Sequence, residues 1–331
     1  MGQPAQTDAA ERFRRLVGPD LDRVEAALDG ILGTDTGLAG EVCAHVLSSP
    51  GKRLRPILVL LVSRLGPRDP ARAVTAAAAV ELLHTATLIH DDAIDHSSLR
   101  RGRVTVNAQW GPNTSLIFGD YLYSRGFLLL SEAELFDAMR LLASATHLMT
   151  QGELMQCERR GRLDIGEDEY LHIVRLKTAS LFAAACRVGV SASTDGDAHA
   201  GAVTRFGENL GIAYQMVDDL LDFVGVERAL GKPVGSDVRE GRATLPLIRA
   251  LREASEADRT DFLALLRSDG ATGDRWTDVV EFVERHGGTD YCRKTVGHYV
   301  EAAKEALRDV APGDARDGLV GIAEYVAGKC P

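Results

Sequence analysis

The stretch LLHTATLIHDDAID (residues 82–95) joins an apolar run to an acidic pentapeptide, Asp91–Asp95, and a second stretch of the same design, GIAYQMVDDLLD (residues 211–222), ends in Asp218–Asp222. On a helix, the first and last Asp of each pentapeptide share one face about one turn, roughly 6 Å, apart. Carboxylates this close repel one another unless a positive charge lies between them. Carboxylate oxygens suit Mg²⁺, which keeps further positions for phosphate oxygens.

Either pentapeptide taken alone is equally well explained as a solvated acidic helix end. The pair favours a site, because a basic, glycine-containing segment follows each one: SSLRRGR (residues 97–103) and VERALGKPVGSD (residues 226–237). Acidic residues followed by basic residues, twice, indicate a metal together with an anionic phosphate.

The composition excludes several classes of protein. The 331 residues carry a net charge of −10 without a long run of Lys or Arg, so we expect no nucleic-acid partner. The N-terminal residues lack the apolar core of a signal peptide, and no run approaches the roughly 18 apolar residues of a membrane span. We therefore expect a soluble, cytoplasmic protein.

The cysteines and histidines lack metal-binding spacing. Five cysteines are scattered without a CxxC pair, and we interpret them as reduced thiols: Cys43, Cys157, Cys186, Cys292 and Cys330. No HExxH or paired Cys/His pattern supports a zinc site.

Apolar residues recur at spacings of three and four along nearly every long segment, which predicts an all-α protein. We expect helices near residues 8–31, 37–48, 53–65, 70–95, 112–130, 132–160, 167–191, 199–226, 238–254, 259–267, 274–286, 289–310 and 314–328. The length alone would suggest two domains. Because both acidic segments must face one cavity, we predict a single domain over residues 1–331. Its motifs lie at about 51–246, and residues 251–331 form C-terminal packing helices.

Basic residues outside the pentapeptides supply candidate anion ligands. In PGKRLRP (residues 50–56), Lys52 and Arg55 are three residues apart and can face one way at a helix start. A solvated basic patch explains this motif alone equally well. Four further residues extend the set and could offset the charge of a bound diphosphate: Arg100, Arg101, Lys177 and Lys232.

Five co-linear segments together resemble the trans-isoprenyl diphosphate synthases, the polyprenyl synthetase family. They are GKRLRP, LIHDDAIDHSSLRRGR, QGELMQ, RLKTASLFAAACRVG and QMVDDLLDFVGVERALGKPVGSD. The chain is especially similar to the bacterial octaprenyl-type synthases. The resemblance implies an all-helical bundle around a central cavity, usually in a homodimer.

The resemblance also implies roles for individual residues. Three Mg²⁺ ions, with Mn²⁺ as a substitute, would be held by two aspartate-rich motifs: Asp91, Asp92 and Asp95, and Asp218, Asp219 and Asp222. The pocket for isopentenyl diphosphate would comprise Lys52, Arg55, His84 and Arg101. The allylic diphosphate would lie against Arg100, Lys177, Thr178, Gln215 and Lys232. Taken alone, His84 is more often a satisfied core histidine.

The implied reaction needs no protein nucleophile. Metals and cations draw diphosphate off the allylic primer, the double bond of isopentenyl diphosphate attacks the carbocation, and proton loss restores an alkene. Electrostatic preorganisation and exclusion of water would supply most of the rate. Release of the apolar product would involve a transient membrane contact.

We expect the residues that precede Asp91 on its helix to determine the length of the product. Relatives that make short products carry bulky aromatics at the positions of Ala86 and Thr87, so the small residues here predict a hexaprenyl to decaprenyl product. Leu83 and Leu82 lie further along the same path and could close it sooner, which would make the chain a geranylgeranyl or farnesyl diphosphate synthase. A terpene cyclase would normally lack the second acidic motif, and a non-catalytic subunit would have lost motif aspartates.

Overall fold

The computed structural model describes residues 4–48, 51–193, 198–224, 234–267 and 275–331, apart from the side chains of residues 4–15 and of Arg267. Within these residues the chain is helical almost throughout, which confirms the all-α prediction. The first half contains α1 (Pro4–Leu32), α2 (Gly37–Leu47), α3 (Leu54–Val62), η1 (Ser63–Leu65), α4 (Pro70–Ile94), α5 (Val106–Trp110), α6 (Pro112–Glu132) and α7 (Phe136–Arg159). The second half contains α8 (Glu167–Val174), η2 (Arg175–Ala179), α9 (Ser180–Ser191), α10 (Ala200–Val224), α12 (Ser236–Arg239), α13 (Leu245–Glu253), α14 (Glu256–Arg267), α15 (Trp276–Arg285), α16 (Gly288–Ala306) and α17 (Asp314–Ala327).

Three features depart from the predicted elements. A two-stranded antiparallel hairpin, β1 (Leu99–Arg100) and β2 (Arg103–Val104), and the short helix α5 follow the first acidic segment. The predicted helix at 167–191 is divided by η2, a single turn of π-helix. The predicted helix at 238–254 begins instead at Leu245, because Gly241 adopts a φ of 72°, which ends the short α12 segment.

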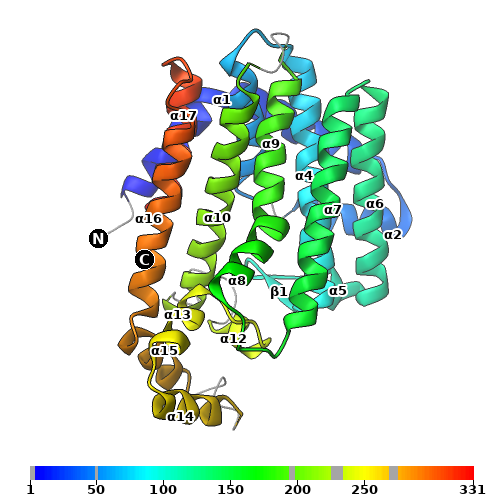
Figure 1. Ribbon diagram of the computed structural model, residues 1–331. Coiled ribbons are helices and arrows are strands. Elements are labelled where there is room, and N and C mark those ends of the chain that lie inside the picture. Colours follow the sequence, from blue (N-terminus) through cyan, green and yellow to red (C-terminus); the bar gives the residue numbers. More distant parts are fainter. Residues whose placement is uncertain (1–3, 49–50, 194–197, 225–233, 268–274) are drawn as a thin grey trace.

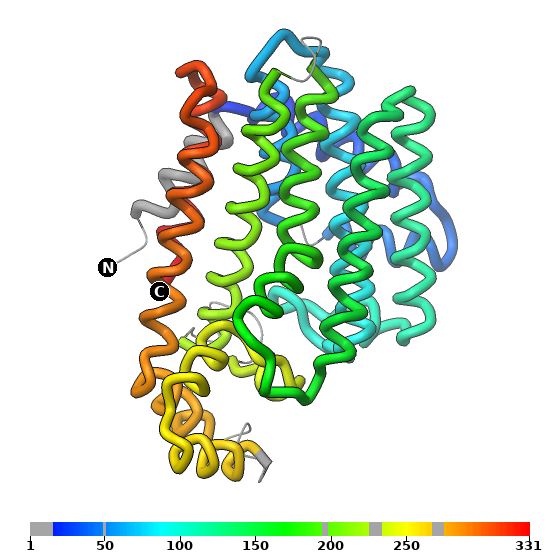
Figure 2. The backbone as a smooth tube through the Cα atoms, viewed as in Figure 1, coloured from blue at the N-terminus to red at the C-terminus, as the bar shows by residue number. Residues whose placement is uncertain are grey.

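The long helices run side by side, and the ends of α4 and α10 lie at one end of the bundle (Figure 1). The chain descends along α4, rises along α6, descends along α7, rises along α9 and descends again along α10 (Figure 2). The acidic segments at the ends of α4 and α10 are therefore brought to the same end, although more than a hundred residues separate them in sequence.

Helix α4 is the buried centre of this arrangement. Pro70 occupies its first turn, and the Asp69 carboxylate caps it by accepting the Ala71 N–H at 2.9 Å. The consecutive alanines Ala76–Ala79 are all fully buried, so small side chains let neighbouring helices approach closely. Among the described helices, α4 is the one long and apolar enough to cross a membrane, yet 67% of its apolar window is buried inside the protein, as in the core helix of a globular fold.

Glycines on two helices make room for the π-turn η2. A Cβ on Gly152 of α7 would lie 2.7 Å from the backbone nitrogen of Lys177, and one on Gly211 of α10 would lie 2.6 Å from the Cα of Ala179. No side chain fits at either position without displacing backbone. The π-turn, a feature often found at functional sites, is thus held between α7 and α10.

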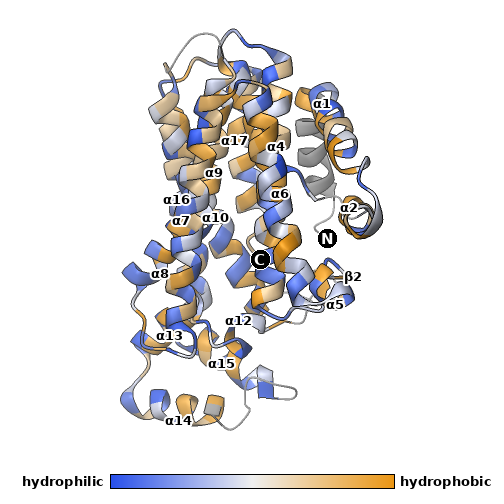
Figure 3. Cartoon of the chain, turned by 90° about the vertical axis from the view of Figure 1, so that its right-hand side faces the viewer, coloured by the Kyte–Doolittle hydropathy of each residue, from blue (hydrophilic) through white to orange (hydrophobic). Residues whose placement is uncertain are grey.

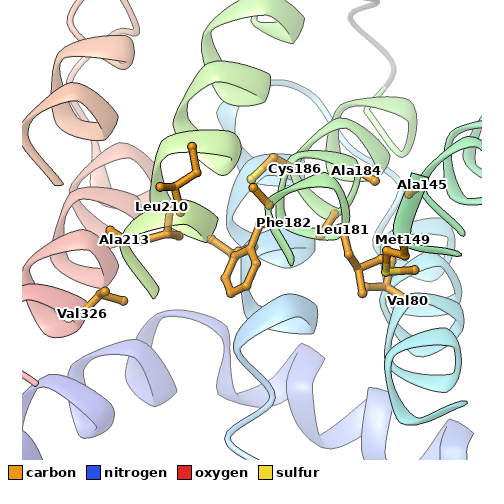
Figure 4. Close-up of a cluster of buried hydrophobic side chains, with 14 of the residues drawn as sticks. Val80, Ala145, Met149, Leu181, Phe182, Ala184, Cys186, Leu210, Ala213 and Val326 are labelled. Atoms are coloured by element: carbon orange, nitrogen blue, oxygen red, sulfur yellow. The ribbon is translucent and has the colours of Figure 1, made fainter. Parts of the chain in front are cut away.

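The apolar core lies between the long helices. In Figure 4, Phe182 of α9 lies between Leu210 and Ala213 on one side and Leu181 and Met149 on the other. The Phe182 ring also makes a cation–π contact with the Arg55 guanidinium, which lies 4.4 Å from the ring centroid. Hydropathy colouring shows hydrophobic residues within the bundle and hydrophilic ones gathered near α8 and α12 at the lower end (Figure 3).

The close approach at Gly211 gives a prediction for stability. Gly211→Ala should lower the free energy of unfolding by about 1–3 kcal/mol, because the added methyl overpacks the contact between α10 and η2. Gly201→Ala, on the same helix, is the matched control. The nearest atom to its Cβ is the flexible Arg205 guanidinium at 3.4 Å, so stability should be unchanged or slightly higher. Equal denaturant midpoints for the two variants would contradict the packing account.

Candidate active site

One large cavity opens at the lower end of the bundle, with a volume of about 1650 Å³. Its wall is built from α3, α4, β1, α6, α7, α8, η2, α9, α10, α12 and residues beside them, and both polar and apolar side chains contribute. Most of the residues singled out in the sequence lie in this wall: Lys52, Arg55, His84, Thr87, Asp91, Asp92, Asp95, Arg100, Arg101, Lys177, Thr178, Gln215, Asp218 and Asp219.

The first acidic segment forms the last turn of α4. Asp92 is 5% exposed and accepts the Arg100 Nε–H at 2.8 Å, while an oxygen of Asp91 lies 3.9 Å from Lys177 Nζ. Burial raises the pKa of Asp92 to about 6, with Arg100 acting against it, and burial likewise raises the pKa of Asp91. Arg160 and Arg242 bind Asp95, one on each carboxylate oxygen. Basic side chains therefore pair with all three carboxylates, but at Asp91 and Asp92 the effect of burial on the pKa outweighs theirs.

The second acidic segment is less uniform. Asp218 is exposed to the cavity. Asp219 is buried and accepts hydrogen bonds from the Tyr170 hydroxyl at 2.6 Å and from Gln215 at 2.8 Å. Burial and the nearby Asp237 carboxylate raise its pKa. Asp222 is fully buried outside the cavity wall, where it accepts the backbone N–H of Asp237 at 2.9 Å.

Lys52 and Lys329 place two ammonium groups together in the wall. Lys329 follows α17 and was not suggested by any motif, since the C-terminal residues meet GKRLRP only through the fold. Burial, followed by the neighbouring Lys329 ammonium, lowers the pKa of Lys52 to about 8. Arg101 packs close by, because a Cβ on Gly51 would lie 2.9 Å from its Nη1. Lys52, Lys329 and Arg101 thus converge in the wall, and the neighbouring Asp218 carboxylate offsets the Lys329 charge at Lys52 only in part, which favours an anionic ligand.

Arg55 and His84 form a hydrogen-bonded pair between α3 and α4. Arg55 Nη1 donates to His84 Nε2 at 2.9 Å, so the imidazole acts as the acceptor. Burial, followed by the charges of Arg55 and Arg101, holds the pKa of His84 well below its usual value, which keeps the ring neutral. Among the described residues, the buried Nε of Arg55 finds no hydrogen-bond partner. An oxygen-rich anion would supply one.

The π-turn carries the remaining predicted residues. Lys177 Nζ donates to Gln156 at 3.0 Å and forms an ion pair with Glu153, both from the QGELMQ segment of α7. Thr178 donates to Gln215 at 2.7 Å, and Gln215 in turn donates to Asp219. This chain of hydrogen bonds links η2 to the second acidic segment.

Lys232 lies outside the described residues. Other predicted site residues do not lie in the cavity wall. Ala86, Leu83 and Leu82 are buried in α4 behind the wall, whereas Thr87 of the same set reaches it. Their assignment to a product channel remains a prediction.

Several residues of the site were missed in the sequence. Arg53 caps α3 in the left-handed conformation, with φ of 52°, and its guanidinium binds Glu25 at 2.7 Å and Glu81 at 2.6 Å. Arg160 and Arg242 were also missed, since nothing local in the chain relates either one to Asp95. The partner of each is set by tertiary contacts.

The donor set fits a hard divalent cation. Carboxylate oxygens from Asp91, Asp95 and Asp218 line one cavity, and burial already disfavours a negative charge on Asp91 unless a cation offsets it. In the part of the chain that the structure describes, no three His, Cys, Asp or Glu side chains are already gathered as a metal cage.

Known proteins resemble the chain in both sequence and fold. The polyprenyl synthetase family model matches residues 37–283. A short chain isoprenyl diphosphate synthase of Methanothermobacter thermautotrophicus is 36% identical over 288 residues, covering 85% of this chain and 87% of that protein. An octaprenyl diphosphate synthase of Haemophilus influenzae is 30% identical over 313 residues, covering 95% of each chain.

The fold agrees with a crystal structure of a polyprenyl synthase from Caulobacter crescentus in complex with calcium and isoprenyl diphosphate. The two chains superpose with a TM-score of 0.91 at 35% identity, over 96% of this chain and 97% of the other. Sequence and structure agree, and the chain belongs to the polyprenyl synthetase family.

Proposed function

We propose that this enzyme condenses isopentenyl diphosphate with an allylic diphosphate in the cavity at the ends of α4 and α10. The chain is a prenyltransferase of the isoprenyl diphosphate synthase class. The observation that carries the proposal is one cavity wall with two acidic segments and, beside them, the cations Lys52, Arg55, Arg101 and Lys177. Aspartates and cations in one wall suit a ligand that combines metal ions with diphosphate.

The acidic segments would hold Mg²⁺, in the three-ion arrangement that the family resemblance implies, with Mn²⁺ as a substitute. A similar protein crystallised with calcium and isoprenyl diphosphate, which supports a need for divalent cations. The residues for the first segment are Asp91 and Asp95, with Asp92 tied to Arg100 beside them. Bound there, the metal would offset the negative charge that develops on the departing diphosphate.

The chain's own residues would orient two substrates. Lys177 and Arg100 lie beside the first acidic segment and would bind the allylic diphosphate, together with Thr178, Gln215 and Lys232. Lys52, Arg55, His84 and Arg101, joined by Lys329, would bind isopentenyl diphosphate.

The chemistry then follows from this placement. The bond between the allylic carbon and oxygen breaks, the alkene of isopentenyl diphosphate forms the new carbon–carbon bond, and a proton passes to the released diphosphate. The apolar wall, including Leu88 and Leu181, would exclude water from the carbocation.

Assembly and location are part of the proposal. We expect a homodimer, in line with the family resemblance. Large apolar side chains stay exposed on α6 and α7 and offer a surface that a second copy could cover: Ile117, Leu128, Phe136 and Leu154. The cytoplasmic location and a transient membrane contact during product release remain predictions.

Elongation is the direct test of the proposed function. Incubation with Mg²⁺, labelled isopentenyl diphosphate and geranyl, farnesyl or geranylgeranyl diphosphate should give longer products, sized by chromatography. Asp91→Asn should lower turnover by about 100-fold or more, because a ligand is lost for the metal that would offset the charge on the departing diphosphate. Asp137→Asn, in the exposed first turn of α7, is the matched control and should retain activity. Failure to elongate any primer would refute the proposal.

The lowered pKa of Lys52 predicts a pH dependence. As pH rises through about 8, the ammonium loses its proton and its attraction for diphosphate, so kcat/KM for isopentenyl diphosphate should fall. Lys52→Arg keeps its charge over this range and should remove the fall. Lys329→Met removes the neighbouring ammonium that helps to lower this pKa and should move the fall to higher pH. An identical pH profile in all three proteins would exclude Lys52 as the titrating group.

Product length is proposed to be hexaprenyl to decaprenyl, set along α4. Ala86→Phe should shift the product distribution to shorter chains, because a ring would block the path behind Asp91. The control is Ser124→Phe, which adds the same ring on the exposed side of α6. Unchanged product lengths for Ala86→Phe would show that residues other than Ala86 determine product length.

A further inference from the structure

Two arginines from distant loops occupy both oxygens of Asp95. Arg160 Nη2 donates to Oδ1 at 2.9 Å, and Arg242 Nη1 donates to Oδ2 at 3.0 Å. The Asp95 side chain is 12% exposed, and all three residues lie in the cavity wall. Charge-assisted hydrogen bonds of this kind are the strong ones in proteins. The last carboxylate of the first acidic segment is therefore already neutralised by protein.

A backbone clasp places these two arginines. Arg160 follows the end of α7 and Arg242 precedes α13, and the adjacent Gly161 donates its N–H to the Gly241 carbonyl at 2.9 Å. Both glycines have positive φ, 80° and 72°. A Cβ on Gly241 would lie 2.7 Å from the Gly161 nitrogen, so the loops meet where a side chain would not fit. The clasp thus holds the two loops so that one guanidinium from each binds the Asp95 carboxylate.

The two arginines differ in what holds them. Arg242 also pairs with Asp237 at 3.1 Å and with Glu240. These two carboxylates would still hold the Arg242 guanidinium in place if a metal ion bound Asp95. The Arg160 side chain is 41% exposed, and it donates a hydrogen bond to Asp95. Arg160 can accordingly leave Asp95 for water or for another anion more easily than Arg242 can.

We propose that Arg160 and Arg242 neutralise Asp95 in place of a metal ion. A divalent cation then binds the first acidic segment by displacing these guanidinium groups from Asp95. This inference rests on the proposed function in taking Asp95 as a cation ligand. A metal ion alone must compete with two guanidinium groups. When a diphosphate arrives with the metal, the displaced Arg160 gains an anionic partner, so the site favours loading of metal and diphosphate together.

Binding of Mn²⁺ alone, without substrate, measures this competition by calorimetry. Arg160→Gln should bind Mn²⁺ about five- to tenfold more tightly than the unaltered protein, since one competing charge is gone. Arg160→Lys keeps that charge and should shift the affinity less. The matched control is Arg162→Gln, two residues away, whose exposed side chain pairs with Asp164 at 3.1 Å. It should leave Mn²⁺ affinity unchanged.

Either of two results would overturn the proposal. One is an Mn²⁺ affinity of Arg160→Gln within twofold of the unaltered protein, and the other is an equal gain in Arg162→Gln, which would indicate a general charge effect. Thermal unfolding without metal reports whether each variant is folded, and the partly exposed position of Arg160 favours an intact fold. Because no substrate is present, the result is independent of the elongation assay, which tests the proposed function separately.

Discussion

The mutual repulsion of carboxylates in one cavity is the constraint on which the rest of the site depends. Asp91, Asp92 and Asp95 lie at the end of α4, whose centre is fully buried, and burial raises the pKa of Asp91 and Asp92. Without a cation, the protein offsets this charge with its own basic residues: Arg100 on Asp92, Lys177 near Asp91, and two arginines on Asp95. The same basic residues are those a diphosphate would attract once metal takes over the carboxylates. The same basic residues can therefore pair with the carboxylates and, once metal ions bind those carboxylates, with a diphosphate.

The scaffold fixes these charges through close backbone packing. Gly152 and Gly211 leave space for the π-turn that presents Lys177 and Thr178, and Gly161 meets Gly241 where the arginine loops join. The core contributes as well, because the Phe182 ring packs against the Arg55 guanidinium. Rigid elements of this kind suit a reaction that relies on placed charges rather than on a protein nucleophile.

Structural features that depend on neighbouring residues in the chain could be predicted from the sequence. Helical periodicity predicted most long helices to within a few residues, and the buried alanines of α4 followed from an apolar pattern on all its faces. The convergence of both acidic segments was also foreseen, since their chemistry requires one cavity. Arg160, Arg242, Tyr170 and Lys329 were missed because their partners lie far away in sequence. The break at Gly241 was missed because a positive φ leaves no trace in an apolar pattern.

The central claim is that both acidic segments act on one diphosphate through divalent cations. It is tested most directly by titrating inorganic pyrophosphate into the protein with and without Mg²⁺, for the unaltered chain, Asp91→Asn, Asp218→Asn and the double variant. The account predicts Mg²⁺-dependent binding that each single variant weakens, with the double variant losing clearly less than the sum of the two losses. Pyrophosphate binding that is independent of Mg²⁺, or losses that simply add, would contradict it.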